Sequence, residues 1–291
     1  MMDQYPPILI GVDGGGTGCR VVVGTAQDGI LAEAKGGRAN VSTNFDEAIA
    51  HILEATRAAV KDAGQDLEQM NHAVAHLGLA GFTGPEIGKR VTDALPFAKS
   101  IVTEDTTTTI VGAIGADDGY VVALGTGTII ARQRSAVQTC IGGWCYQVSD
   151  QASGAWLGHG ALEQTLLVVD GIVAPSALSD RMLEKLGGAA GIVQFSLKAR
   201  PGDFGTLAPD VVETAAAGDA IGTMLMQRGA DYLKNAIGAL EYQTNDILCL
   251  SGGVGPHYAP YLPEHMTANL VSAKGRAVDG AFALAMTAAA E

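Results

Sequence analysis

Charged side chains are scarce in this chain of 291 residues, and cations are the scarcest of them. Only 17% of the residues are Asp, Glu, Lys or Arg, and 18 Lys and Arg stand against 31 Asp and Glu, a net charge of −13. Binding of nucleic acid needs clustered cations, so the composition argues against a nucleic-acid partner. The hydrophobic share of 47% also excludes intrinsic disorder, which requires low hydrophobicity and high charge.

Cysteine is scarce, and long apolar runs are missing as well. The four cysteines (Cys19, Cys140, Cys145 and Cys249) form no C-x-x-C pair and no regular framework. No uncharged apolar run reaches the roughly 18–20 residues of a membrane span. The opening MMDQYPP lacks the basic and apolar regions of a signal peptide. We therefore expect a reduced, cytoplasmic protein with no membrane partner.

Glycine, in contrast, is abundant. The chain has 39 glycines in 291 residues, about 13%, where roughly 7% is usual. They follow no G-X-Y period, so they predict tight turns and close backbone approaches. Three glycine-rich turns carry the argument about function.

The first turn lies between two predicted strands, 8–12 and 20–24, and reads Asp13, Gly14, Gly15, Gly16, Thr17. Glycine N–H groups can converge on an anion, Thr17 adds a hydroxyl donor, and Asp13 can hold Mg²⁺ beside a phosphate. The pattern G-x-x-x-x-G-K-[ST] is absent, and Cys19 stands where G-x-G-x-x-G needs glycine. A glycine hairpin with an incidental Asp is the alternative.

A second turn follows the predicted strand 120–124 and reads Gly125, Thr126, Gly127, Thr128. Its surroundings repeat the opening pattern of strand, small-residue turn and strand, which indicates a duplicated unit. The pair of turns suggests two phosphate clamps, although a small-residue turn alone is common.

The third turn follows the predicted strand 247–250 and reads Ser251, Gly252, Gly253, Val254, Gly255. A flat base or a ribose could lie against such a backbone, and a plain strand-to-helix turn is equally compatible.

Helical periodicity dominates elsewhere. The pattern Asn44-x-x-Glu47 predicts a helix start, and Gly64 predicts its end. A short helix is predicted after Pro85 and another over 106–114. The later predicted helices cover 155–169, 177–186, 209–217, 219–240 and 278–289. Strands followed by helices in both halves indicate a two-domain α/β or α+β protein.

In this order and spacing, GVDGGGT, ALGTGT and SGGVG resemble the phosphate-1, phosphate-2 and adenosine motifs of the sugar-kinase, Hsp70 and actin superfamily. Within it, the chain is similar to the BadF/BadG/BcrA/BcrD-type group over essentially its whole length. The resemblance implies an α/β, duplicated ribonuclease H-like (actin/Hsp70/hexokinase-type) two-domain fold with mixed sheets and an interdomain cleft. It implies an N-terminal domain, 1–116, completed by a C-terminal helix, 277–291, and a second domain, 117–276. It also implies ATP and Mg²⁺, with Asp13 and Asp105 as metal ligands.

Further motifs point to the sugar. N-acetylglucosamine kinases of this group typically carry G-D-E-G-S after GGW, with the Asp contacting the sugar, whereas this chain has SDQAS at 149–153. The S-D-Q form, RANVS at 38–42 and RPGDFGTLAP at 200–209 look like bacterial glucosamine kinases. The resemblance implies sugar contacts from Asn40, Gly143, Trp144 and Asp150. Trp144 could equally pack against the protein.

A carboxylate at a strand end that opens a helix can accept the proton of an attacking sugar hydroxyl. Relatives have an Asp preceded by a small residue there, whereas Glu104 precedes Asp105 here. Neighbours on a strand face opposite ways, so one of the two is expected to face the site, and alignment favours Asp105. The implied function is phosphorylation of the 6-hydroxyl of D-glucosamine by ATP, in an enzyme compatible with a homodimer. An N-acetylglucosamine kinase and a BadF-type activator ATPase are the alternatives.

Overall fold

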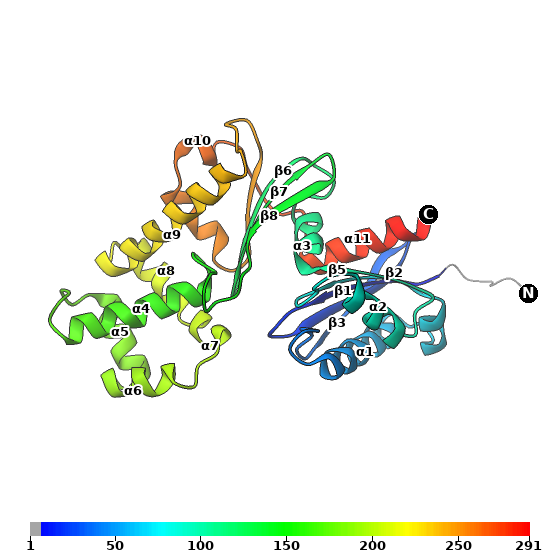
Figure 1. Cartoon of the computed structure of the whole chain (residues 1–291), viewed down its shortest axis with the longest axis horizontal. Helices are drawn as coiled ribbons and strands as arrows, with labels where there is room; N and C mark the ends of the chain where they lie inside the picture. The colour runs from blue at the N-terminus through cyan, green and yellow to red at the C-terminus, as the bar shows by residue number, and fades with distance from the viewer. Residues whose placement is uncertain (1–6) are drawn as a thin grey trace, which may run out of the picture. The chain divides into compact units, whose positions relative to one another are not determined.

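Five strands near the start of the chain form a mixed sheet (Figure 1). They are β1 (Leu9–Gly14), β2 (Cys19–Thr25), β3 (Gly29–Gly36), β4 (Val74–Leu79) and β5 (Lys99–Glu104). The order is β3-β2-β1-β4-β5; β1, β2 and β3 pair antiparallel, and β1, β4 and β5 pair parallel. The structure, a computed structural model, describes residues 7–291. The carboxyl ends of the three parallel strands meet at one edge, where Gly14 pairs with Leu79 and Leu79 with Glu104.

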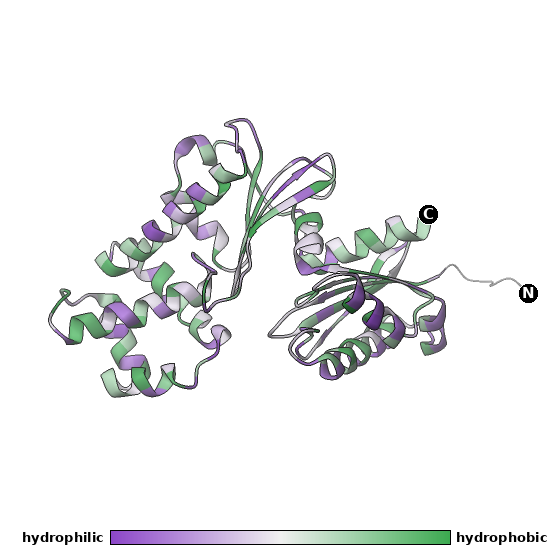
Figure 2. Ribbon diagram, in the orientation of Figure 1, coloured by the Kyte–Doolittle hydropathy of each residue, from purple (hydrophilic) through white to green (hydrophobic). Residues whose placement is uncertain are grey.

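Helices cover both faces of this first sheet. They are α1 (Phe45–Asp62), α2 (Pro85–Ala94), α3 (Asp105–Ile114) and α11 (Ala277–Ala290), with a 3₁₀ turn at Leu67–His72. The alternation along β1 explains the two layers: Ile10 packs in the cluster that contains Ile52 of α1, and Leu9 packs with Phe282 of α11. Hydrophobic and hydrophilic residues alternate around α1 in Figure 2, as expected for a helix with one buried face.

The predicted start of α1 is confirmed. Asn44 is its N-cap, and the side-chain oxygen of Asn44 accepts the N–H of Glu47 at 3.3 Å. The Glu47 carboxylate does not complete a capping box in the usual way, because it accepts from the Asn44 side-chain amide at 2.9 Å.

A second mixed sheet repeats the arrangement of the first. It contains β6 (Gly119–Leu124), β7 (Thr128–Arg134), β8 (Val137–Gly142), β9 (Leu248–Ser251) and β10 (Leu270–Val271). The order is β10-β9-β6-β7-β8; β6, β7 and β8 pair antiparallel, and β6, β9 and β10 pair parallel. This is the topology of the first sheet, strand for strand, so the duplicated α/β fold with mixed sheets is confirmed.

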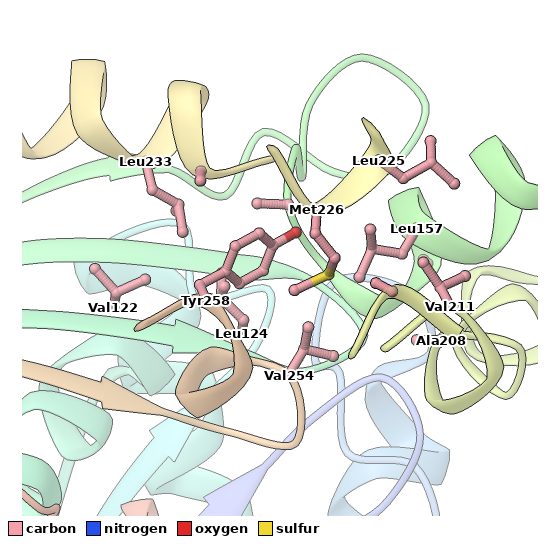
Figure 3. Close-up of a cluster of buried hydrophobic side chains, with 14 of the residues drawn as sticks. Val122, Leu124, Leu157, Ala208, Val211, Leu225, Met226, Leu233, Val254 and Tyr258 are labelled. Carbon is pink, nitrogen blue, oxygen red and sulfur yellow. The ribbon is translucent and has the colours of Figure 1, made fainter. Parts of the chain in front are cut away.

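The long connection between β8 and β9 is helical. It contains α4 (Gly154–Val169), α5 (Ala177–Leu186), α6 (Gly188–Ser196), α7 (Pro201–Gly205), α8 (Ala208–Ala216) and α9 (Ala220–Ala239). A 3₁₀ helix, η2 (Gly255–Tyr261), and α10 (Glu264–Thr267) lie between β9 and β10. Figure 3 shows part of the core of this second unit, where Tyr258 and Val122 lie among side chains from α9 such as Met226 and Leu233.

Between β8 and β9, the helices α6 and α7 escape the sequence patterns. α6 contains two glycines and buries only Ile192 among its side chains, and α7 has five residues. Low helix propensity and the lack of a long apolar stripe explain why periodicity misses both.

The chain divides into two units: one holds the chain up to Ala116 together with Ala273–Glu291, and the other holds Asp117–Ser272. Residues 273–276, assigned to the second domain from sequence, bond to α3 in the first unit. Lys274 and Gly275 donate their backbone N–H groups to the carbonyls of Ala113 and Gly112 at 2.9 and 2.8 Å. Within residues 7–291, no helix is both long and apolar enough to cross a membrane.

Candidate active site

The first glycine turn joins β1 to β2, as predicted. The N–H of Gly15 donates to the carbonyl of Gly18 at 2.9 Å and closes the turn. A Cβ on Gly14 would lie 2.6 Å from the Leu79 side chain, whereas a Cβ on Gly16 would meet nothing within 4 Å. Gly14 is therefore needed for packing, and Gly16 faces open space that a ligand can enter.

A cavity of about 180 Å³ lies beside this turn, within the first unit. Asp13, Thr17, Arg20 and Lys35 contribute to its lining. Thr17 belongs to the turn, and the other three residues belong to the antiparallel strands, where Asp13 pairs with Arg20 and Arg20 with Lys35. The lining of this cavity thus combines one carboxylate, one hydroxyl and two cations.

The strand register brings Asp13 and Asp105 to the same edge of the sheet. Asp105 is the first residue of α3 and follows β5 directly. Burial raises the pKa of Asp105 to about 6, and the negative charge of Asp13 adds to the rise, against the N–H of Thr106, which lowers it. Burial also raises the pKa of Asp13, although the charges of Arg20 and Arg276 oppose the shift. Two interacting, partly buried carboxylates are suited to a shared cation or to proton transfer.

Glu104 differs from its neighbour in position. It is the last residue of β5, is exposed, and accepts the hydroxyl of Thr106 at 3.2 Å. Glu104 and Asp105 are not neighbours on one strand, as was expected from the sequence, because the backbone changes from strand to helix between them. The structure nevertheless distinguishes the two carboxylates, since Glu104 is exposed, whereas burial and the charge of Asp13 raise the pKa of Asp105.

The second glycine turn lies against the start of α4. Gly154 and Ala155 donate their N–H groups to the carbonyls of Gly125 and Thr126, at 2.8 and 3.4 Å. Ser153 caps α4, with its Oγ accepting the N–H of Trp156 at 3.1 Å. The N-terminus of a 16-residue helix favours a nearby anion, so this turn has the electrostatics of a phosphate site.

Asp150 and Thr128 brace this turn from inside. The N–H of Thr128 donates to Asp150 Oδ1 at 3.3 Å, and its hydroxyl donates to the carbonyl of Gln151 at 2.7 Å. Thr128 is 2% exposed and both of its donors are engaged, so it anchors the turn. A Cβ on Gly127 would lie 3.1 Å from Asp150 Oδ2, and burial raises the pKa of Asp150. Sequence reasoning missed this bracing role, because nothing local links 128 to 150.

The third glycine turn is held by the core of the second unit. Gly252 has a φ of +78°, and a Cβ there would lie 2.4 Å from the carbonyl oxygen of Leu124. Val254 donates its N–H to that same carbonyl at 3.0 Å. The side chains of Val254 and Tyr258 are buried together (Figure 3), which fixes the turn against β6.

A cavity of about 560 Å³ opens between the second and third turns, inside the second unit. It is lined by Gly125, Thr126, Gly154, Gly205, Ala208, Pro209, Val212, Glu213, Ala216, Gly253, Val254 and His257. Most of these residues are small or apolar, and the volume suits a nucleoside-sized ligand. Four of the lining residues belong to turns that sequence reasoning selected, whereas those from α8 and His257 were missed. The motif RPGDFGTLAP, noted only as a resemblance, supplies Gly205, Ala208 and Pro209 and was the available signal.

The expected sugar contacts divide between the two units. Asn40 belongs to the first, where its Oδ1 accepts from the N–H and hydroxyl of Ser42 and from the N–H of Thr43, at 2.8–3.1 Å. Gly143, Trp144 and Asp150 belong to the second. Trp144 is 76% exposed, so it does not serve as a packing residue within its unit. The first unit therefore offers charged and hydroxyl groups, and the second unit offers an apolar cavity.

Comparison with known proteins gives a consistent picture. The chain is 28% identical over 278 residues to the glucosamine kinase GspK of Vibrio cholerae serotype O1, covering 95% of each chain. A solved structure from Chromobacterium violaceum, described as a candidate N-acetylglucosamine kinase, is 31% identical, covers 96% of this chain and 99% of its own, and has a TM-score of 0.89. A ROK family glucokinase from Streptomyces griseus, solved with glucose and AMPPNP, shares the fold, with 16% identity, coverage of 96% and 99%, and a TM-score of 0.64.

The family model described as the BadF/BadG/BcrA/BcrD ATPase family matches residues 10–279, which contain all three glycine turns, Asp105 and the cavity. The chain therefore belongs to the BadF/BadG/BcrA/BcrD ATPase family.

Proposed function

We propose that this protein is an amino-sugar kinase that transfers the γ-phosphoryl group of ATP to the 6-hydroxyl of D-glucosamine. The observation that carries the proposal is Asp105, a partly buried carboxylate at the start of α3 whose pKa is raised to about 6. A general base is most effective when its pKa lies near the working pH. The similarity to a glucosamine kinase over 95% of the chain supports the substrate class.

Asp105 acts as the general base in this mechanism. It accepts the proton of the sugar hydroxyl as the oxygen attacks the γ-phosphorus; the bond from that phosphorus to the bridging oxygen breaks, and ADP leaves. Proton removal by a positioned carboxylate contributes a typical factor of about 10²–10⁴ to the rate.

The nucleotide is held mainly by backbone groups. The turn formed by Gly14, Gly15, Gly16 and Thr17 binds phosphate oxygens in the first unit, and the turn formed by Gly125, Thr126 and Gly127 does so in the second, beside the start of α4. The adenosine occupies the cavity against Gly252, Gly253 and Val254. Thr128 contributes by keeping the second turn in place.

Asp13 and Asp105 fit a divalent cation. Both are carboxylates with pKa values raised by burial, so a nearby cation would offset an unfavourable charge at each. Mg²⁺ prefers carboxylate oxygens and phosphate oxygens together. When bound, it supplies positive charge to the phosphoryl oxygens.

The sugar contacts Asn40, Gly143, Trp144 and Asp150 in this proposal. An N-acetylglucosamine kinase is the second candidate, because the Chromobacterium violaceum protein carries that description. The enzyme works in the cytoplasm, where ATP is available.

A coupled assay of ADP release with glucosamine, N-acetylglucosamine and glucose tests the substrate, and phosphorus NMR of the product tests the 6-position. We expect glucosamine to give the highest kcat/KM. A clear preference for the acetylated sugar would select the second candidate, and no turnover with any of the three would refute the proposal.

Asp105→Asn tests the mechanism. We expect kcat to fall about 100-fold or more while ADP binding is retained, because the amide cannot accept the proton. Glu104→Gln is the matched control, since it makes the same change one residue earlier, and it should keep most of the activity. If Glu104→Gln loses activity and Asp105→Asn keeps it, the general base is Glu104 and not Asp105.

A further inference from the structure

One carboxylate lies among the residues that line the large cavity of the second unit. Apart from Thr126 and His257, the other lining residues are Gly, Ala, Pro and Val, and Glu213 is the exception. A carboxylate in an apolar ligand cavity is unfavourable for the anionic parts of a nucleotide and favourable for hydrogen-bond donors.

The periodicity of α8 aims Glu213 at the cavity. Pro209, Val212, Glu213 and Ala216 all line it, and their spacing of i, i+3, i+4 and i+7 is one face of a helix. The Glu213 side chain is 72% exposed, so it lies on the open side of the cavity and is accessible to a ligand.

An ion-pair network restrains Glu213. Arg181 of α5 donates its Nη1–H to Glu213 Oε2 at 2.9 Å and lies 3.4 Å from Asp210 Oδ1. Lys185 donates to Asp210 Oδ2 at 2.6 Å. The network joins α5 to α8, and an Arg held between two carboxylates loses rotamer freedom and limits that of its partners.

The bond from Arg181 uses only one carboxylate oxygen of Glu213. An ionised carboxylate has about four acceptor positions, so capacity remains for donors from a ligand. Gly205, Ala208 and Val212 are less exposed than Glu213 and carry no polar side chain, so their part of the lining suits a flat base, and the more polar ribose then lies beside Glu213.

We propose that Glu213 accepts hydrogen bonds from the ribose hydroxyls of the nucleotide, and that Arg181 positions the carboxylate for this contact. Glu213 is thus a specificity residue for ribonucleotides over nucleotides that lack these hydroxyls. The inference rests on the proposed use of ATP and is independent of which sugar is phosphorylated.

Isothermal titration of the whole protein with ADP and with 2′,3′-dideoxy-ADP, without sugar, tests the contact. We expect the wild type to bind ADP about 10- to 100-fold more tightly, the range for hydrogen bonds to a charged group. In Glu213→Ala the two affinities should become nearly equal, because the variant loses affinity only for ADP. Glu163→Ala on the exposed face of α4 is the matched control and should keep the wild-type ratio.

Arg181→Met tests the positioning role. We expect the ratio of the two affinities to fall several-fold, with partial recovery in Arg181→Lys, and little change in thermal stability, since exposed ion pairs contribute about 0–1 kcal/mol. A merely structural Arg181 would change the thermal midpoint and leave the ratio unaltered. Glu213→Gln, which keeps an acceptor oxygen without the charge, should give an intermediate ratio and serves if Glu213→Ala does not fold.

Three results would overturn the inference. The first is a wild-type ratio of the two affinities in Glu213→Ala, and the second is an equal loss of affinity for both nucleotides in that variant. The third is that Glu213→Ala keeps its preference for ADP over the dideoxy nucleotide but loses a preference for ADP over inosine diphosphate, which would assign Glu213 to the base. Absence of any ADP binding to the wild type would refute the proposed function along with the inference, whereas ADP binding without ribose selectivity would refute the inference alone.

Discussion

Asp105 should lower the free energy of unfolding of the protein, and Asp105→Asn should raise it. The folded state raises the pKa of this carboxyl from its ordinary 3.8 to about 6, mainly by burial and next by the charge of Asp13. A shift of this size corresponds to about 3 kcal/mol of penalty on the ionised form. The asparagine side chain has nearly the same shape and carries no charge, so it avoids the penalty.

The sign of the pH dependence follows from the raised pKa. Well below pH 4 the carboxyl is protonated in both the folded and the unfolded state, and the two proteins should be equally stable. As the pH rises from about 4 to 6, the unfolded state has released the proton that the folded state still holds, so the wild type loses stability across this range, and the loss is complete above about pH 6. Above about pH 7 the variant should be more stable by up to about 3 kcal/mol.

Urea unfolding at pH 4, 5, 6, 7 and 8, with a chelator present to exclude divalent cations, measures this difference. The variant that loses catalytic activity should thus gain stability, as expected where a site is strained for function. Glu104→Gln provides the control and should show a much smaller difference, because Glu104 is exposed. A variant that is less stable than the wild type at pH 8, or a difference that does not change with pH, would refute the argument.

Three further predictions concern the second unit. Tyr258→Phe should raise the free energy of unfolding by about 1 kcal/mol, since the buried Tyr258 hydroxyl has no hydrogen-bond partner among the described residues. Urea titrations measure this difference, and a destabilised variant would contradict the prediction. Gly252→Ala should lower the unfolding free energy by about 1–3 kcal/mol, because the φ of residue 252 is +78° and a Cβ there would meet the Leu124 carbonyl. It should also weaken ADP binding in titration calorimetry, and a wild-type affinity would show that this turn does not contact the nucleotide. Asp150→Ala should raise the KM for the sugar, because the proposed sugar contact is lost. It should also lower the thermal midpoint, because the N–H of Thr128 loses its acceptor. An unchanged sugar KM would remove Asp150 from the sugar site.

Local patterns in the sequence were sufficient for the strands, the three glycine turns and most of the helices. Asp13 to Thr17 stands between two short hydrophobic runs, and a turn between such runs needs only neighbouring residues to form. The same holds for the start of α1 at Asn44, where the capping contacts span three residues. The order of the turns was also enough to indicate the family.

Tertiary structure decided the properties of the site. The raised pKa of Asp105 depends on burial and on Asp13, which is distant along the chain but belongs to β1, at the same edge of the sheet and separated from β5 by β4 alone. The large cavity is assembled from five separate segments, and the contact between Arg181 and Glu213 joins two helices that no local pattern relates. Desolvation, charge interactions and cavity shape depend on distances in space, and a linear sequence specifies those distances only after the chain has folded.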